Sequence, residues 1–149
     1  MISVVIPTDN SQHLLPRCFD SLITAAVRGV VREVIVSDAG SSDGTLTIAD
    51  AAGAHIVHSR KGRGAQMIDG VAKAKSDWLL FLHPQTALEP GWEVEAEIIS
   101  SCLFSLGSLL RAIAIRTVAG LNERGTAILW RDHLHGAGPM NPATALPFD

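Results

Sequence analysis

The chain has 149 residues, of which 47% are hydrophobic and 18% are charged, and its formal net charge is −3. A chain of this size and composition can bury a core, which argues against disorder and predicts a single domain over residues 1–149. The sequence has no basic stripe, which argues against a nucleic-acid partner. Its two cysteines, Cys18 and Cys102, lack metal-ligand spacing and fit a reducing compartment, so a cytoplasmic location is expected.

Strand and helix patterns alternate over the first 92 residues. Short runs rich in β-branched and other apolar residues predict strands at 2–6, 33–38, 55–59 and 78–83. Helical spacing of apolar residues predicts one helix after the cap candidates Asn10 and Ser11, one from about Thr45 to Ala52, and one over 67–75. The segment 60–66, which holds Gly62 and Gly64, is predicted to be a loop.

Continuous apolar strands joined by helices predict an α/β fold with a mostly parallel sheet and helices on both faces. Right-handed crossovers make this a Rossmann-like arrangement, in which the carboxyl ends of the strands face one crevice. The polar residues predicted to line that crevice lie at 7–10, 38–43, 59–63 and 83–86.

The pattern weakens beyond residue 92. One long or broken helix is expected first, then a strand within 126–132, then an irregular tail rich in Pro and Gly. The longest apolar run, 98–115, contains Arg111, Gly107 and four serines. A membrane span needs about 20 mostly apolar residues. The run therefore predicts a buried or interface helix, and contact with a membrane surface stays open.

The strongest local pattern is "SDAGSSDGT" at 37–45. Asp38 ends a strand, and a turn of small residues leads into a helix whose N-terminus would offer unpaired N–H groups to a phosphate. Asp38 could accept hydrogen bonds from a base or a ribose. In the alternative interpretation, Asp43 only caps the helix and the glycines only turn the chain. Neither a G-x-G-x-x-G turn nor a Walker A loop is present.

The second pattern is "SRKGRGAQM" at 59–67. Arg60, Lys61 and Arg63 lie beside two glycines and could wrap a diphosphate, with arginine supplying bidentate contacts. The alternative is a solvated basic loop. Because the segment follows a strand end on the face that holds Asp38, its position favours binding.

Four segments resemble a family 2 glycosyltransferase of the GT-A fold, close to a bacterial subgroup: "SVVIPTDN", "EVIVSDAGSSDGT", "GAHIVHSRKGRGAQMIDGVAKAKSDWLLFLH" and "LEPGW". The resemblance covers about residues 2–92 and continues weakly in "LNERGTAILWRDHLHGAGP". It implies a nucleotide-binding half over 1–92, a helical acceptor-side remnant over 93–149, and a truncated C-terminal part. It also implies a UDP- or GDP-linked sugar donor and transfer with inversion to an unknown acceptor.

The resemblance implies roles for two sets of residues. The set expected to bind the nucleotide sugar is Pro7, Thr8, Asn10, Asp38, Ser41, Ser42, Asp43, Lys61, Gly62, Arg63, Gly64 and Gln66. His83 and Gln85 stand where the family carries an acidic motif that holds Mn²⁺ or Mg²⁺. A carboxylate is expected at the place of Gln85, whose neutral amide oxygen is a poorer ligand. No catalytic residue is assigned, and neither Glu123 nor Asp132 is favoured as the base.

Three hypotheses remain open. The chain is an active inverting glycosyltransferase, a nucleotide-binding pseudoenzyme, or a structural subunit that pairs through residues 98–115. Gln85 and the absence of an adjacent pair of acidic residues after residue 100 argue against the first. The turn at Asp38 and the basic segment argue against the third. A homodimer is expected, because a short sheet would leave apolar surface to cover.

Overall fold

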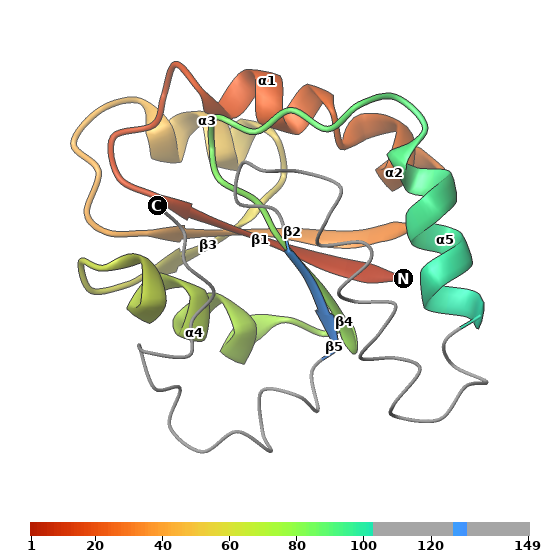
Figure 1. The fold of residues 1–149 in the computed structure, drawn as a ribbon. Helices are drawn as coiled ribbons and strands as arrows, with labels where there is room; N and C mark the ends of the chain where they lie inside the picture. The colour runs from red at the N-terminus through yellow and green to blue at the C-terminus, as the bar shows by residue number, and fades with distance from the viewer. Residues whose placement is uncertain (103–126, 131–149) are drawn as a thin grey trace.

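A computed structural model of the chain describes residues 1–102 and 127–130, and Figure 1 shows it as a ribbon. The described elements are β1 (Ile2–Thr8), α1 (Leu15–Asp20), α2 (Ile23–Val27), β2 (Val31–Asp38), α3 (Thr45–Ala51), β3 (His55–His58), α4 (Arg63–Lys73), β4 (Trp78–Phe81), α5 (Trp92–Cys102) and β5 (Ala127–Trp130). The predicted alternation of strands and helices is confirmed, and the strand expected within 126–132 is β5. The expected irregular tail and the two acids Glu123 and Asp132 lie outside the described residues.

The sheet has five strands in the order β3-β2-β1-β4-β5. Strands β1 to β4 pair in parallel, and β5 pairs antiparallel to β4. The predicted mostly parallel sheet is therefore confirmed. From β1 the chain adds β2 and β3 on one side and then returns to add β4 on the other. The order thus reverses between β1 and β4, and in open α/β sheets ligands bind at the carboxyl ends of the strands at such a switch point.

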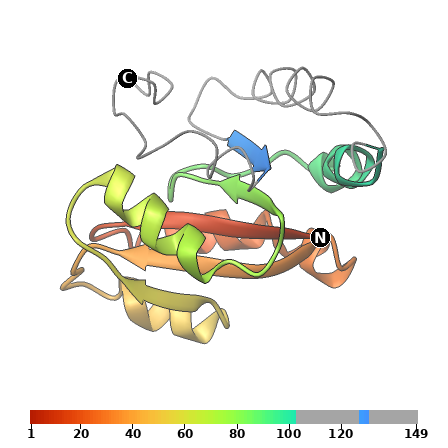
Figure 2. The ribbon, with the colours of Figure 1, turned by 90° about the horizontal axis from the view of Figure 1, so that it is seen from below.

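Helices cover both faces of the sheet, as predicted (Figures 1 and 2). Alternate residues of β1 face opposite layers, because side chains alternate along a strand. Val4 and Ile6 pack with residues of α1, α2 and α5. Val5 packs on the opposite face, where Met67 and Val71 of α4 cover it. Figure 2 views the sheet from the side that α4 covers.

Helix α4 begins earlier than the sequence predicted. Its first residue is Arg63, and the glycine before it, Gly62, has a φ of 119° that a side chain would disfavour. The prediction of a loop over 60–66 was wrong from Arg63 onward, because Gly64 was taken as a loop marker while the residues around it favour a helix. Arg63, Gly64 and Gln66 therefore lie on the first turn of α4.

The helix expected after Asn10 and Ser11 is divided into α1 and α2. The N-cap of α1 is Leu14, so the prediction that Asn10 or Ser11 caps this helix was wrong. Pro16 lies in the first turn, where the missing N–H of proline costs nothing. Asn10 instead has a φ of 49°, a left-handed conformation that asparagine tolerates better than most residues.

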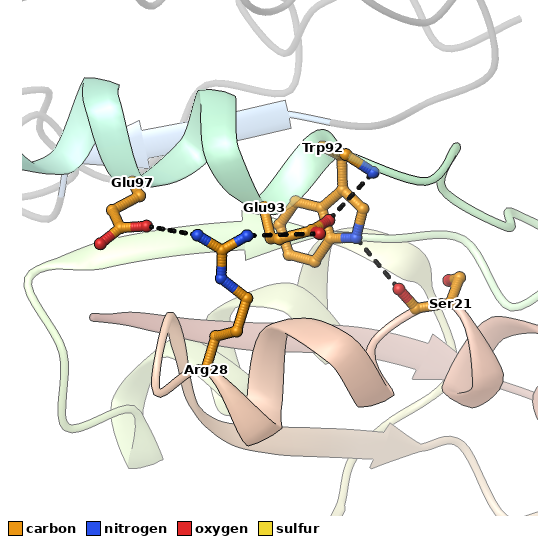
Figure 3. A network of polar contacts seen from close by, with 6 residues as sticks. Ser21, Arg28, Trp92, Glu93 and Glu97 are labelled. Carbon is orange, nitrogen blue, oxygen red and sulfur yellow. Dashed lines mark hydrogen bonds and ion pairs between the residues drawn. The ribbon is translucent and has the colours of Figure 1, made fainter.

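Helix α5 is tied to the turn between α1 and α2 and to the residue that follows α2 (Figure 3). The indole nitrogen of Trp92 donates to the carbonyl of Ser21 at 3.0 Å. Arg28 lies 3.7 Å from Glu93 and 3.2 Å from Glu97, oxygen to nitrogen. These contacts hold the start of α5, where the segment that follows β4 ends. Within residues 1–102 and 127–130, no helix is long and apolar enough to cross a membrane.

Candidate functional site

The carboxyl ends of β1 to β4 meet at one edge of the sheet, as the sequence predicted. Thr8 pairs with Asp38, and Asp38 pairs with His58. Beyond the paired strands, the amide of Leu82 donates to the carbonyl of Val5 at 3.0 Å, so the chain that leaves β4 stays beside β1. The polar segments that follow these strands are thereby brought together.

Asp38 is fully buried, and its carboxylate organises the turn after β2. It accepts hydrogen bonds from the hydroxyls of Thr8 and Ser41 and from the backbone N–H groups of Gly40 and Ser41. Burial alone would raise the pKa of Asp38, but these bonds, first that of the Ser41 hydroxyl, lower the pKa below its ordinary value. An ionised carboxylate offers about four acceptor positions, and the chain's own donors occupy them. The predicted contact of Asp38 with a base or ribose stays a prediction.

Asn10 joins the loop after β1 to the turn after β2. Its backbone N–H donates to the hydroxyl of Ser41 at 2.8 Å. Its side-chain oxygen accepts from the backbone N–H of Ser42 at 3.0 Å. The left-handed conformation of Asn10 is held by this pair of contacts, which fix two segments that are far apart in the sequence.

A second set of contacts between the same segments surrounds the start of α3. The backbone N–H of Gln12 donates to Asp43 at 3.1 Å, and the side-chain oxygen of Gln12 accepts from the N–H of Gly44 at 2.7 Å. Asp43 also accepts from the N–H of Thr45 at 3.0 Å. Burial would raise the pKa of Asp43, and the bonds from Thr45 and Gln12 lower it by more.

The N–H groups of this turn are therefore not available to a phosphate. Side chains of the protein occupy the N–H groups of Gly40, Ser41, Ser42, Gly44 and Thr45. The N-cap residue of α3 is Gly44, without a side-chain cap bond, and Asp43 accepts from the N–H of the first helical residue, Thr45. Phosphate binding at the start of this helix stays a prediction.

Gln66 is buried and connects α4 to two strand ends. Its side-chain nitrogen donates to the carbonyl of Thr8 at 2.7 Å and to the carbonyl of Ser37 at 2.8 Å. One turn later Gly70 lies so close to the sheet that a Cβ there would be 2.5 Å from Cγ1 of Val5. The resemblance assigned Gln66 to nucleotide binding, and its side-chain nitrogen instead holds the strand ends against α4.

Arg63 precedes Gln66 by three residues, so the two lie on the same side of the helix. Because Gln66 contacts the ends of β1 and β2, the exposed side chain of Arg63 lies beyond the edge of the sheet. Its charge reaches the end of β4: partial burial lowers the pKa of His83, and the positive charge of Arg63 lowers it further. Lys61 and Gly62 are exposed in the short connection before this helix.

The end of β4 does not have the composition of a divalent-metal site. His83 and the exposed Gln85 form a turn in which the N–H of Thr86 donates to the carbonyl of His83 at 2.9 Å. Mg²⁺ and Mn²⁺ prefer carboxylate oxygens, and the carboxylate of Asp38 is already occupied. In the part of the chain that the structure describes, no group of three or more His, Cys, Asp or Glu side chains could hold a metal. The residues present at this strand end therefore do not fit Mn²⁺ or Mg²⁺.

An α/β sheet of this order, with polar residues over its switch point, has the architecture of nucleotide-binding α/β proteins. The chain belongs to glycosyl transferase family 2, since the model of that family matches residues 3–95. The predicted family and fold class are thus confirmed.

Curated relatives of the chain include glycosyltransferases from mycobacteria. A PGL/p-HBAD biosynthesis glycosyltransferase of Mycobacterium tuberculosis is 35% identical over 95 residues, which are 59% of this chain and 36% of the relative. Glucosyl-3-phosphoglycerate synthase of the same species is 34% identical over 90 residues, which are 54% of this chain and 28% of the relative. The chain thus spans about a third of the length of these relatives.

Solved structures agree with the fold. Glucosyl-3-phosphoglycerate synthase from M. tuberculosis, in complex with Mn²⁺, UDP and glucosyl-3-phosphoglycerate, has a TM-score of 0.51 at 32% identity, over 56% of this chain and 33% of that chain. S. aureus TarS has a TM-score of 0.57 at 23% identity, over 67% of this chain and 32% of that chain, which supports the fold alone.

Proposed function

We propose that the chain binds a nucleoside-diphosphate sugar at the edge of the sheet where β1, β2 and β4 end, and transfers the sugar to an acceptor with inversion. The observation that carries the proposal is the exposed Arg63 on the first turn of α4, whose charge acts on His83 at the end of β4, in a chain of this family. A diphosphate is an anionic leaving group, and cations near its oxygens stabilise the charge that develops as it leaves.

A uridine nucleotide is the first donor to test. The M. tuberculosis synthase, which is 32% identical, has been crystallised with UDP-glucose and Mn²⁺. The organised turn at Asp38 and the contacts of Asn10 with Ser41 and Ser42 give this edge a defined shape, which favours binding because little ordering remains to be done. GDP-linked donors remain the alternative.

The reaction would be a direct displacement. A bond forms between the acceptor oxygen and the anomeric carbon while the bond from that carbon to the β-phosphate oxygen breaks. The configuration inverts, the nucleoside diphosphate leaves with the bonding pair, and the proton of the acceptor passes to a base. We assign no base among residues 1–102 and 127–130.

Calorimetric titration of the 149-residue chain with UDP, GDP and uridine tests the binding step. We expect one diphosphate to bind at least about tenfold more tightly than uridine, because the cations contact the phosphates. If neither diphosphate binds at about 1 mM, the proposal is refuted. Release of UDP from UDP-sugars over a panel of acceptors then tests the transfer.

Nucleotide binding without transfer is the second candidate. It is favoured by Gln85, which stands where the resemblance places a carboxylate, and by the composition of this strand end, which does not fit a metal. Tight UDP binding with no release of UDP from any donor would support this candidate. A cytoplasmic location, contact with a membrane surface, a homodimer, and the division into 1–92 and 93–149 stay predictions.

A further inference from the structure

We propose that the guanidinium of Arg63 takes the place of a divalent metal ion at this site, so that the chain binds a nucleoside diphosphate without Mn²⁺ or Mg²⁺. This inference rests on the proposed function and concerns how the same site neutralises the diphosphate. It starts from the disagreement between the end of β4 and the metal that the family resemblance implies.

The position of Arg63 is fixed by its own helix. Gln66 and Gly70 face the sheet, the first through hydrogen bonds to the ends of β1 and β2, the second through close contact with Val5. Residues 63, 66 and 70 lie on one side of a helix with 3.6 residues per turn. Arg63, one turn before Gln66, therefore extends this side beyond the edge of the sheet, where the strands end.

A second anchor holds the same helix. The hydroxyl of Ser59, the residue after β3, donates to the carboxylate of Asp69. Together with Gln66, this contact ties α4 to the ends of β1, β2 and β3. The cation on its first turn is thus carried by a fixed element, although its own side chain is exposed. A fixed starting point reduces the ordering that the side chain must undergo to meet a phosphate.

The chemistry of the neighbouring strand end favours a cation from the protein over a metal. The charge of Arg63 acts on His83, so the guanidinium lies near this strand end. A divalent ion bound at His83 and Gln85 would lie close to this positive charge with no carboxylate from the strand end to offset the repulsion. A diphosphate beside the same residues is attracted, and the planar guanidinium can donate two parallel hydrogen bonds to phosphate oxygens.

The orphan hydroxyl at this strand end agrees with an anionic ligand. Thr86 is 5% exposed, and its side-chain oxygen has no hydrogen-bond partner among the residues that the structure describes. A hydroxyl can donate to a phosphate oxygen. Lys61, two residues before Arg63, is exposed and adds a second positive charge before α4.

Calorimetric titration of the full chain with UDP tests the inference in two buffers. One contains EDTA, and in the other UDP is mixed beforehand with Mn²⁺ or Mg²⁺, because these ions also bind free UDP. We expect affinities that agree within about twofold. Binding that requires the metal overturns this inference and leaves the proposed function standing. Failure of UDP and GDP to bind in either buffer overturns the proposed function, and this inference falls with it.

Variants then locate the charge. Arg63→Met removes the guanidinium but keeps an unbranched apolar stem, and we expect UDP binding in EDTA to weaken about 10- to 100-fold while uridine binding is unchanged. Arg63→Lys should restore part of the loss. The matched control is Lys73→Met, which removes an exposed cation from the last turn of the same helix and should change the affinity by less than about twofold. Equal effects of Arg63→Met and Lys73→Met would refute the role of Arg63.

A fourth variant converts the site. Gln85→Asp supplies the carboxylate that a metal site needs and places a negative charge near Arg63. We expect it to weaken UDP binding in EDTA and to make added Mn²⁺ restore the affinity, a dependence that the unchanged chain lacks. If Mn²⁺ strengthens UDP binding to the unchanged chain as much as to Gln85→Asp, the inference is wrong. Thermal melting of each variant confirms that it is folded.

Discussion

Replacement of Gln66 by methionine should destabilise the protein by about 2 kcal/mol. The side-chain nitrogen of Gln66 makes two buried hydrogen bonds, to the carbonyls of Thr8 and Ser37, and each such bond contributes about 1 kcal/mol net. Methionine has a similar length and removes both donors without adding a charge. In a chain of this size the change should lower the melting temperature by about 4–8 °C.

The comparison with Gln66→Glu makes the test sharper. At neutral pH this variant turns the buried donor into an ionised acceptor that faces two carbonyl oxygens, so it should cost more than Gln66→Met. The control is Ile68→Gln, because Ile68 is 54% exposed on the same helix and the change should stay within about 0.5 kcal/mol. Urea unfolding gives the three free energies of unfolding. If Gln66→Met costs no more than Ile68→Gln, the two bonds do not hold α4 to the strand ends.

Three further changes test the packing. Burial raises the pKa of Glu33, but hydrogen bonds, first from Ser3, lower it by more. The pKa of Glu33 in the folded protein therefore lies below its ordinary value, and the carboxylate stabilises the fold at any pH above the unfolded pKa. Glu33→Gln should therefore cost about 1–3 kcal/mol at neutral pH, and urea unfolding should show the difference from the unchanged chain disappearing as the pH falls through the folded pKa. Gly70→Ala should cost about 1–3 kcal/mol in the same assay, because its Cβ would lie 2.5 Å from Cγ1 of Val5. Adding Val5→Ala should recover part of this loss. If the losses of stability from the two single variants simply add in the double variant, the clash is contradicted. Trp92→Phe removes the 3.0 Å bond to a backbone carbonyl and should cost about 1 kcal/mol, seen in thermal melting; an unchanged melting temperature would contradict it.

Strands β1 and β4 could be predicted because they are buried on both faces or nearly so. Seven residues of β1 and four of β4 form continuous apolar or small-residue runs, since central strands of a parallel sheet pack against helices on both sides. The exposed ends of β3 mark it as an edge strand, and its apolar run is shorter. The meeting of the strand ends follows from the parallel topology, so the place where the polar segments come together was predictable as well.

Hydrogen-bond partners could not be predicted in this way. Gln66 and Thr8 are 58 residues apart in the sequence, and Asn10 and Ser42 are 32 apart, so no local pattern shows that these side chains meet. The start of α4 was missed for a local reason, because a glycine on its first turn resembles a loop residue. In retrospect the spacing of Gln66 and Gly70, four residues apart, indicated a helix face that lies close to the sheet.

Hydrogen bonding also separates the residues that build the candidate site from those that are free to contact a ligand. The resemblance assigns Asp38, Asn10, Asp43 and Gln66 to nucleotide binding, yet all four use hydrogen-bonding groups within the protein. The first three bond in the turn after β2, and Gln66 bonds to carbonyls of β1 and β2. Substituting any of them would weaken ligand binding through the shape of the site, with a loss of stability alongside. Arg63 is exposed and has no structural role of this kind among the described contacts, so the loss of its charge should weaken binding and leave stability unchanged. A ratio of affinity loss to stability loss, measured residue by residue, therefore identifies which polar side chains touch the ligand.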